Sequence, residues 1–326
     1  MVDCLLRADR TEGPSPPRTL GASLGQWVGI AANAGSGRGG GRRAVAGLAA
    51  RLDALRIGCR VAWTPAGRER LVADAGRDEA CRCLVAAGGD GTVAALINDH
   101  PGVPIAVLPT GTENLFARHF RLDRRPERLA RAIDAGRVAA LDLGLAGPRR
   151  FSLMAGIGFD ADVVTRHHEA RVARTGSAGP THRAAYVEPV LRSSLNYAFP
   201  ALSVRVDDPD AEETIVGTTA FVFNLPRYAL GLPFVPEARG DDGKLDLIVF
   251  REPGPFRALH YLWLVLRGRH LRRDDVQHRR VVSATIEVPI PVPYQLDGDP
   301  GGQVVPTSAG SLAIGVLPSA VEVIVP

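Results

Sequence analysis

The chain has 326 residues and a formal net charge of +4 at pH 7, and its basic residues comprise 38 arginines and a single lysine, Lys244. A phosphate-binding loop of the G-x-x-x-x-G-K-[ST] type, a protein-kinase catalytic site and a pyridoxal-phosphate site each need a lysine of their own. The composition therefore excludes these sites from the residues before Lys244, and any lysine-dependent mechanism must use that one side chain.

The rest of the composition is typical of an ordinary globular chain, with 45% hydrophobic and 23% charged residues. The charges of both signs are interspersed, so we expect no nucleic-acid partner. The four cysteines offer no second pair that would complete a zinc site, and we expect reduced thiols in a cytoplasmic protein. No apolar stretch approaches the length of about 18 residues that a membrane span needs, so we expect no transmembrane segment.

The first half of the chain has the pattern of an α/β domain. Residues 1–25 are rich in proline, glycine, arginine and serine and are expected to form a disordered leader. From 26 to 145, apolar runs alternate with segments of helical periodicity. The expected strands are 27–32, 59–63, 83–87 and 104–108, and the expected helices are 42–56, 66–76, 92–98, 112–120 and 126–135. Because most of these strands are wholly apolar, we predict a doubly wound parallel sheet that is covered on both faces.

The pattern changes after about residue 141. The expected strands are 138–145, 151–157, 201–206, 214–224, 245–250, 281–288 and 311–316, and the two expected helices are 183–198 and 256–269. Residues 166–182 contain two adjacent histidines among polar residues and are expected to form a mobile loop. We therefore predict a second, β-rich domain over 146–310, built as a sandwich.

The first glycine cluster, residues 33–41, lies between the first strand and the first helix. Backbone N–H groups in such a turn, together with the helix dipole, can bind an anion. Gly35, Gly37 and Gly40 also satisfy the G-x-G-x-x-G pattern of dinucleotide sites. The second strand, however, ends at Thr64 without the carboxylate that would bind a ribose hydroxyl. The cluster therefore favours a phosphate site over a dinucleotide site, and a plain flexible turn is the remaining alternative.

Two further glycine turns follow the next two strands. Gly-Gly-Asp-Gly-Thr at 88–92 opens a helix, and its Asp90 is placed either to hold a metal ion or attacking hydroxyl or simply to cap the helix. Pro-Thr-Gly-Thr-Glu-Asn follows at 109–114. Because the carboxyl ends of parallel strands share one edge of a sheet, the three turns predict a ligand site at that edge.

The motif at 88–92, followed by Pro-x-Gly-Thr-x-Asn at 109–114, resembles the catalytic domain of diacylglycerol kinases, sphingosine kinases and their bacterial lipid-kinase relatives. The resemblance runs from about Trp27 to the C-terminus, through three more motifs at 156–161, 241–246 and 296–299. It implies an ATP- and Mg²⁺-dependent kinase that phosphorylates a hydroxyl of a diacylglycerol-like or sphingoid-like lipid. It also implies that the last strands, within 311–326, return to the N-terminal domain.

The resemblance implies roles for individual residues. The ATP phosphates would be contacted by residues of the strand-end turns: Asn33, Gly35, Ser36, Gly37, Thr64, Gly88, Gly89, Asp90, Gly91, Thr92 and Thr112. A structural Mg²⁺ would be held, partly through main-chain carbonyls, by Arg239, Asp242 and Lys244. Catalysis would use Asp90 and a general base in the turn at 296–299, where Asp297 and Asp299 both remain candidates.

Two departures from the family pattern leave other functions open. Leu115 stands where the family commonly has an aspartate of a metal–water network, and Asp299 stands where it usually has the longer glutamate. One alternative is therefore a catalytically weak nucleotide-binding homologue. Another is a NAD kinase-like phosphotransferase, which would share the motif at 88–92, although the motif at 109–114 favours the lipid kinases.

The helix expected at 256–269 carries Leu259, Leu262, Trp263 and Leu266 on one face and is followed by arginines up to residue 273. This segment is either a core-packing helix with a basic end or a surface that meets an anionic membrane. Because a lipid kinase must meet its substrate at a bilayer, we predict a cytoplasmic enzyme that associates peripherally with the membrane. The sequence leaves a homodimer open.

Overall fold

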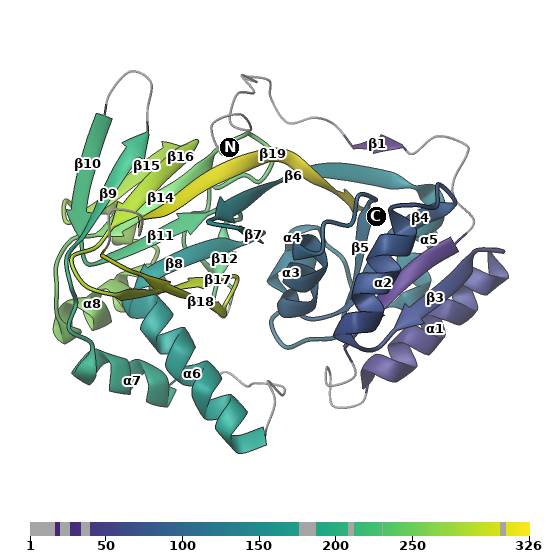
Figure 1. Ribbon diagram of the computed structural model, residues 1–326, viewed down its shortest axis with the longest axis horizontal. Coiled ribbons are helices and arrows are strands. Elements are labelled where there is room, and N and C mark those ends of the chain that lie inside the picture. Colours follow the sequence, from purple (N-terminus) through teal and green to yellow (C-terminus); the bar gives the residue numbers. More distant parts are fainter. Residues whose placement is uncertain are drawn as a thin grey trace. The chain divides into compact units, whose positions relative to one another are not determined.

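The computed structural model describes residues 17–19, 27–33, 40–175, 187–207, 212–229, 231–306 and 311–326. These residues form two compact units, shown as ribbons in Figure 1. The N-terminal unit lies within Glu12–Leu141 and Ser319–Pro326, and the C-terminal unit lies within Asp142–Pro318. Three predicted phosphate ligands, Gly35, Ser36 and Gly37, lie outside the described residues, as does most of the predicted leader.

The N-terminal unit contains a parallel sheet with the strand order β5-β4-β2-β3. Its strands are β2 Trp27–Ala32, β3 Gly58–Ala62, β4 Cys81–Gly88 and β5 Ile105–Pro109. Its helices are α1 Gly40–Ala54, α2 Pro65–Ala75, α3 Asp90–Asn98, α4 Leu115–His119 and α5 Pro126–Ala135. The short strand β1 Arg18–Thr19 pairs with β6 Arg137–Ala146, which continues into the C-terminal unit.

Apolar burial explains this sheet. All five residues of β5 and seven of the eight residues of β4 are buried, as expected of strands that are covered on both faces. Helix α1 buries Val45, Leu48 and Leu52 at helical spacing, and they share one core cluster with the apolar residues of β2, β4 and β5. The predicted parallel α/β fold of this half is confirmed.

The C-terminal unit is a sandwich of two antiparallel sheets. One sheet has the order β15-β14-β11-β8-β17-β18, and the other contains β10-β9-β16-β19. Their strands are β8 Met154–Gly158, β9 Leu202–Asp207, β10 Glu212–Gly217, β11 Thr219–Phe223, β14 Leu245–Phe250, β15 Val276–Val281, β16 Ser283–Glu287, β17 Val292–Leu296, β18 Asp299–Val304 and β19 Leu312–Ile324. Short strands are β7 Arg149–Phe151, β12 Arg227–Tyr228 and β13 Leu232–Pro233, and the helices are α6 Phe159–Thr175, α7 Val187–Asn196, α8 Pro255–Leu266 and the 3-10 helix η3 His270–Arg272.

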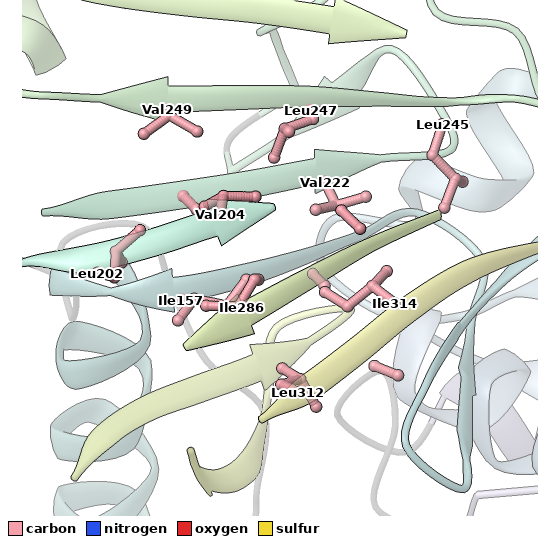
Figure 2. Packing of buried hydrophobic residues seen from close by; sticks show 14 of the residues in the cluster. Ile157, Leu202, Val204, Val222, Leu245, Leu247, Val249, Ile286, Leu312 and Ile314 are labelled. Carbon is pink, nitrogen blue, oxygen red and sulfur yellow. The ribbon is translucent and has the colours of Figure 1, made fainter. Parts of the chain in front are cut away.

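The core of the sandwich lies between the two sheets. Figure 2 shows Val222, Leu247 and Val249 of one sheet directed toward the side chains of the other, which include Val204 and Ile286. These alternate residues are almost completely buried. Alternation of buried and outward side chains is how two facing sheets form one core, and the predicted sandwich is confirmed.

Strand β19 belongs to both units. Its first part pairs antiparallel with β16, from Gly315 opposite Ser283 to Leu312 opposite Ile286. Its last part lies in the N-terminal unit, where Val323 pairs in parallel with Ile105 of β5. The last strand therefore extends the parallel sheet of the first half.

The structure corrects the prediction of a loop over 166–182. Residues up to 175 belong to helix α6, and the rest of that range lies outside the described residues. Ala161, Val164 and His167 follow one another at helical spacing and are all buried, so the helix is held by its packed face. The paired histidines suggested a solvated loop, whereas His167 points into the protein.

Three predicted strands are each two strands, and in all three the chain passes from one sheet to the other. The run 214–224 pairs with β9 up to Gly217 and with β8 and β14 from Thr219 onward, so it passes from one sheet to the other. The run 281–288 divides at Val282, between β15 and β16, in the same way. The run 151–157 divides between β7 and β8. A strand that passes from one packed sheet to the other keeps a continuous apolar sequence, so each of these runs was predicted as a single strand.

Among the helices of the described residues, none is long and apolar enough to cross a bilayer.

Candidate active site

The predicted turns of the N-terminal unit lie at one edge of its sheet. Gly88 of β4 pairs with Pro109 of β5, and Ala87 of β4 pairs with Ala32 of β2. Ala31 of β2 in turn pairs with the last residue of β3. The carboxyl ends of four neighbouring strands are therefore level, and the structure brings together the residues that follow them: Asn33, Thr64, Gly88, Gly89, Asp90, Gly91, Thr92 and Thr112.

The two central glycine turns are packed directly against each other. A Cβ atom added to Gly111 would lie 2.5 Å from the Cα atom of Gly89 and 2.9 Å from Oδ1 of Asn114. A Cβ atom on Gly88 would lie 2.0 Å from Oγ1 of Thr92, whose side chain folds back over the turn. Only glycine permits this close approach of two backbones, so the motifs at 88–92 and 109–114 form one interlocked structure.

Asn114 holds the second turn in shape. Its backbone is left-handed, with φ 50°, and its amide accepts the N–H of Gly111 (3.0 Å) while donating to the Gly111 carbonyl (2.8 Å). Arg124 donates a further hydrogen bond to that carbonyl (2.8 Å). A left-handed residue cannot lie inside a right-handed helix, so helix α4 begins at Leu115 and not at residue 112 as the sequence predicted.

Asp90 anchors helix α4. Its Oδ1 accepts the backbone N–H of Phe116 (3.0 Å), in the first turn of α4. Burial raises the pKa of Asp90, while backbone N–H groups, foremost that of Phe116, hold it down. Leu115, where the family commonly has aspartate, is buried. The capping function that the sequence left open is thus real, but the capped helix is α4 and not the one that Asp90 begins.

The remaining predicted phosphate ligands have local structural roles or face solvent. Thr64 is the N-cap of α2, since its Oγ1 accepts the N–H of Gly67 (3.1 Å). Asn33 is exposed and is tied to β4 by a hydrogen bond from its N–H to the carbonyl of Ala87 (3.1 Å). Thr112 is exposed at the start of the Asn114 turn. This edge therefore presents helix N-termini and hydroxyl groups, which suit an anionic ligand.

The predicted metal turn lies in the C-terminal unit and is held by Asp142. The buried carboxylate of Asp142 accepts the N–H of Gly243 (2.7 Å). The backbone N–H of Asp142 donates to the carbonyl of Gly240 (2.7 Å). Asp242 forms an ion pair with Arg280 and accepts the N–H of Lys244 (3.1 Å). The carboxylates of Asp142 and Asp242 and the N–H groups of Gly243 and Lys244 therefore stabilise the conformation of the turn.

The donors of this turn fit a metal site formed by main-chain oxygens and not one formed by three acidic, histidine or cysteine side chains. Among the described residues, no group of three His, Cys, Asp or Glu side chains could hold a metal ion. Arg239 pairs with Asp241 (3.1 Å), and the Lys244 side chain is exposed. A hard cation such as Mg²⁺ accepts main-chain carbonyl oxygens and water as ligands, and carbonyl oxygens are the donors that this turn could offer it.

Four hydrogen bonds hold the carboxylate of Asp297 in the C-terminal unit. Its Oδ2 accepts the N–H and hydroxyl of Ser152 (2.8 and 2.9 Å), and its Oδ1 accepts the N–H groups of Leu153 (2.8 Å) and Met154 (3.0 Å). Burial raises its pKa to about 6, although these four donors favour the charged form. All four acceptor positions of the carboxylate are in use, so its role is to hold the β7–β8 turn.

Asp299 differs from its neighbour. It begins β18 on the other side of the β17–β18 turn, and its side chain is partly exposed. No hydrogen bond or ion pair to its carboxylate occurs in the part of the chain that the structure describes. The β17–β18 hairpin thus carries one aspartate that accepts four hydrogen bonds and one whose carboxylate accepts none from the described residues.

Sequence reasoning missed two buried polar residues that connect these turns. Asn224 is fully buried, and its Nδ2 donates to the carbonyls of Asp142 and Ser152 (2.8 Å each), so it joins the metal turn to the segment that Asp297 holds. Gln295, also fully buried, accepts the N–H of Gly298 (2.8 Å) and donates to Asp160 (2.9 Å). Both residues lie in or just after apolar strands, where an interrupted apolar pattern was the one signal of their role.

Asp160 is the second acceptor in this network. Tyr228 donates its hydroxyl to the same oxygen of Asp160 (3.2 Å) that Gln295 contacts, and burial raises the pKa of Asp160 to about 6. A Cβ atom on Gly156 would lie 2.6 Å from that oxygen, which explains the glycine in the motif at 156–161. Asp160 of this motif therefore holds Gln295, which in turn accepts the N–H of Gly298 in the β17–β18 turn.

Both halves of the chain match models of known protein families. Residues 28–146 match the family model of the diacylglycerol kinase catalytic domain, and residues 154–325 match that of the YegS C-terminal NAD kinase beta sandwich-like domain. The chain is 29% identical to a diacylglycerol kinase of Staphylococcus carnosus over 68% of this chain and 71% of that protein. It is 28% identical to a diacylglycerol kinase of Mycobacterium tuberculosis over 66% and 70%. A crystal structure of a diacylglycerol kinase from Bacillus anthracis has the same fold, with a TM-score of 0.67 and 20% identity over 92% of this chain and 97% of that one.

Proposed function

The chain belongs to the family of diacylglycerol kinases and related bacterial lipid kinases, and we propose that it transfers the γ-phosphoryl group of ATP to a hydroxyl of a diacylglycerol-like or sphingoid-like lipid. The observation that carries this proposal is the interlocked edge of the N-terminal unit, where Gly89 and Gly111 bring two strand-end turns together. Phosphoryl transfer needs alignment and charge neutralisation more than covalent participation by the protein.

The nucleotide phosphates would be bound by backbone amides, helix N-termini and hydroxyl groups of this edge. Glycine at 88 and 89 lets the backbone approach a polyphosphate closely, and the N-terminus of α3 adds a favourable dipole. Thr64 and Asn33 lie at the ends of the two neighbouring strands. Such a site needs no lysine, which agrees with a chain whose one lysine is Lys244.

The turn of Arg239, Asp242 and Lys244 would hold Mg²⁺ through carbonyl oxygens, and a bound magnesium ion supplies positive charge that neutralises developing negative charge on phosphate oxygens. Asp142 and Arg280 keep this turn in shape through its N–H groups and the Asp242 carboxylate. The carbonyl oxygens would then meet the ion without a rearrangement of the turn.

Of the two candidate bases, Asp299 is the one we assign. A general base must accept the proton of the lipid hydroxyl within hydrogen-bond reach as transfer proceeds. The lone pairs of Asp297 are already occupied by Ser152, Leu153 and Met154, whereas the described residues make no hydrogen bond to the carboxylate of Asp299. Asp297 would therefore fix the turn that presents Asp299.

The test is a transfer assay with γ-labelled ATP and Mg²⁺ on a panel of diacylglycerols and sphingoid bases, with NAD as a further acceptor. We expect label in a lipid and a fall of kcat by about 10²–10⁴-fold in Asp299→Asn, with unfolding unchanged. Asp90→Asn should also lower kcat, and Asp53→Asn, an exposed residue of α1, is the matched control that should not.

Each other outcome has a distinct meaning. Label in NAD and not in lipid would support the NAD kinase-like alternative. Nucleotide binding with no transfer to any lipid of the panel would support the catalytically weak homologue. Lipid labelling that Asp90→Asn leaves undiminished would remove Asp90 from the catalytic residues.

A further inference from the structure

Helix α8 has two apolar faces, and the protein covers one of them. Tyr261, Leu264 and Val265 are buried, and the ring of Tyr261 packs on that of Phe250 in β14, with centroids 4.7 Å apart. This inner face fixes the helix to the sandwich, as the core-packing alternative predicted. Figure 1 shows α8 lying against the edge of the C-terminal unit.

The opposite face of α8 is apolar and exposed to solvent. Phe256 is 86% exposed, Leu259 41%, Trp263 45% and Leu266 56%, and Leu262 at its margin is 40% exposed. The first four recur at intervals of three or four residues, so they form one stripe along the helix. We call these five residues the outer face of α8. An apolar patch that is contiguous and exposed is typical of a surface that meets another protein or a membrane.

The charges on α8 and directly after it are basic. Helix α8 contains no acidic residue and carries Arg257, which forms an ion pair with Asp275 (3.9 Å) beyond the helix. The segment that follows it adds exposed arginines at Arg267, Arg269 and Arg272. The Arg267 guanidinium lies over the ring of Trp263, 5.1 Å from its centroid. A tryptophan beside arginines at one end of an apolar helix face is the composition of segments that lie in the interface of an anionic membrane.

We propose that the outer face of α8, with the arginines that follow it, docks the protein on the surface of an anionic phospholipid bilayer. The inference rests on the proposed function in one respect: a kinase for a bilayer-embedded lipid needs such a surface. A second copy of the chain is a poorer occupant, because a two-fold contact through this face would bring the arginines of both copies into one interface to which α8 contributes no acidic partner.

The direct test is vesicle binding without ATP, so that no catalytic step is involved. The full chain is sedimented with vesicles of phosphatidylcholine alone and with vesicles that contain about one third phosphatidylglycerol. We expect binding to the anionic vesicles only, weakened by added salt. Trp263→Ser and Leu266→Ser should each weaken it about tenfold, since each removes an apolar side chain from the interface. Arg267→Gln should weaken it about fivefold.

The matched control is Ile290→Ser, which removes a side chain that is 48% exposed elsewhere in the same unit. It should leave vesicle binding unchanged. Depth is measured separately by quenching of Trp263 fluorescence with brominated lipids in a variant that carries Trp63→Phe. Trp27, the third tryptophan, is buried and gives a constant background.

The outcomes separate this proposal from the proposed kinase activity. Transfer to a water-soluble short-chain diacylglycerol should be unaffected by Leu266→Ser, while transfer to diacylglycerol in anionic vesicles should fall with binding. Vesicle binding by the outer face without any lipid kinase activity would contradict the proposed function alone. Equal vesicle binding by wild type, Trp263→Ser and Leu266→Ser would overturn the docking surface. If these substitutions instead change the oligomeric state of the protein and leave vesicle binding unchanged, the outer face of α8 contacts a second copy of the chain, which would overturn it too.

Discussion

The contact between the two glycine turns makes Gly111→Ala the most direct perturbation of the sheet edge where we propose that the nucleotide binds. The new Cβ atom would lie 2.5 Å from the Cα atom of Gly89, 3.1 Å from its nitrogen and 2.9 Å from Oδ1 of Asn114. Two carbon atoms without a bond between them lie about 3.5–4.0 Å apart at their best separation. The variant must therefore move one backbone turn by about 1 Å and loosen the hydrogen bonds that Asn114 makes to residue 111.

The cost follows from these distances. Overpacking of a well-packed site costs about 1–3 kcal/mol, and here the obstacle is backbone and not a movable side chain. A loss of that size lowers Tm by about 3–10 °C for a domain of this length. Because a displacement of about 1 Å at a site can reduce turnover about 10²-fold, transfer activity and ATP affinity should fall together.

The assay compares Gly111→Ala with Gly40→Ala, which makes the same substitution in the same unit at the start of α1, where nothing lies within 4 Å. Thermal unfolding is followed with and without ATP and Mg²⁺. Gly40→Ala should unfold at the same or a slightly higher temperature, since alanine favours helix. If Gly111→Ala matches Gly40→Ala in Tm and in stabilisation by ATP, the argument that the two turns are interlocked is refuted.

Three further predictions concern the C-terminal unit. Asp297→Asn leaves two of four donors without an acceptor and should lower the free energy of unfolding in urea by about 2–4 kcal/mol, whereas Asp299→Asn should change it by less than about 0.5 kcal/mol. Because burial raises the pKa of Asp160 to about 6, its contribution to stability is fully present below about pH 4 and is lost as the pH rises through 6. The stability of wild type relative to Asp160→Asn should therefore fall by up to about 3 kcal/mol between pH 4 and pH 7 in urea titrations. Lys244→Arg should retain transfer activity because that side chain is exposed, while Asp242→Ala, which loses the Arg280 ion pair and the cap on the Lys244 N–H, should need more Mg²⁺ for half-maximal rate.

The sequence predicted best what local residues determine. The strands of the N-terminal unit are apolar runs between glycine turns, and Pro126 and Gly136 bound helix α5 at the residues expected. Helix α6 was missed because its buried face includes Ala161, Val164 and His167 among many polar and charged residues, so the apolar periodicity is weak. The interrupted apolar pattern at Gln295 and Asn224 does not identify their partners, because each residue donates a hydrogen bond to one more than 70 positions away in the sequence.

Hydrogen bonds between segments distant in sequence also determine the roles of three acidic residues. Asp90 accepts a backbone N–H group of helix α4, and Asp142 accepts one from the turn at 239–244. Asp297 accepts N–H groups of the β7–β8 turn. An aspartate in a glycine-rich motif is thus as much a clamp for a neighbouring loop as a candidate for chemistry, and sequence does not separate the two. Geometry does, because a carboxylate whose lone pairs are filled by N–H groups has none left for a lipid hydroxyl. On that argument we propose Asp299, which is shorter than the glutamate usual in the family, as the carboxylate of the motif at 296–299 that accepts the proton. The phosphate site that we propose is built from glycine amides, so it needs no lysine in a chain that has only one.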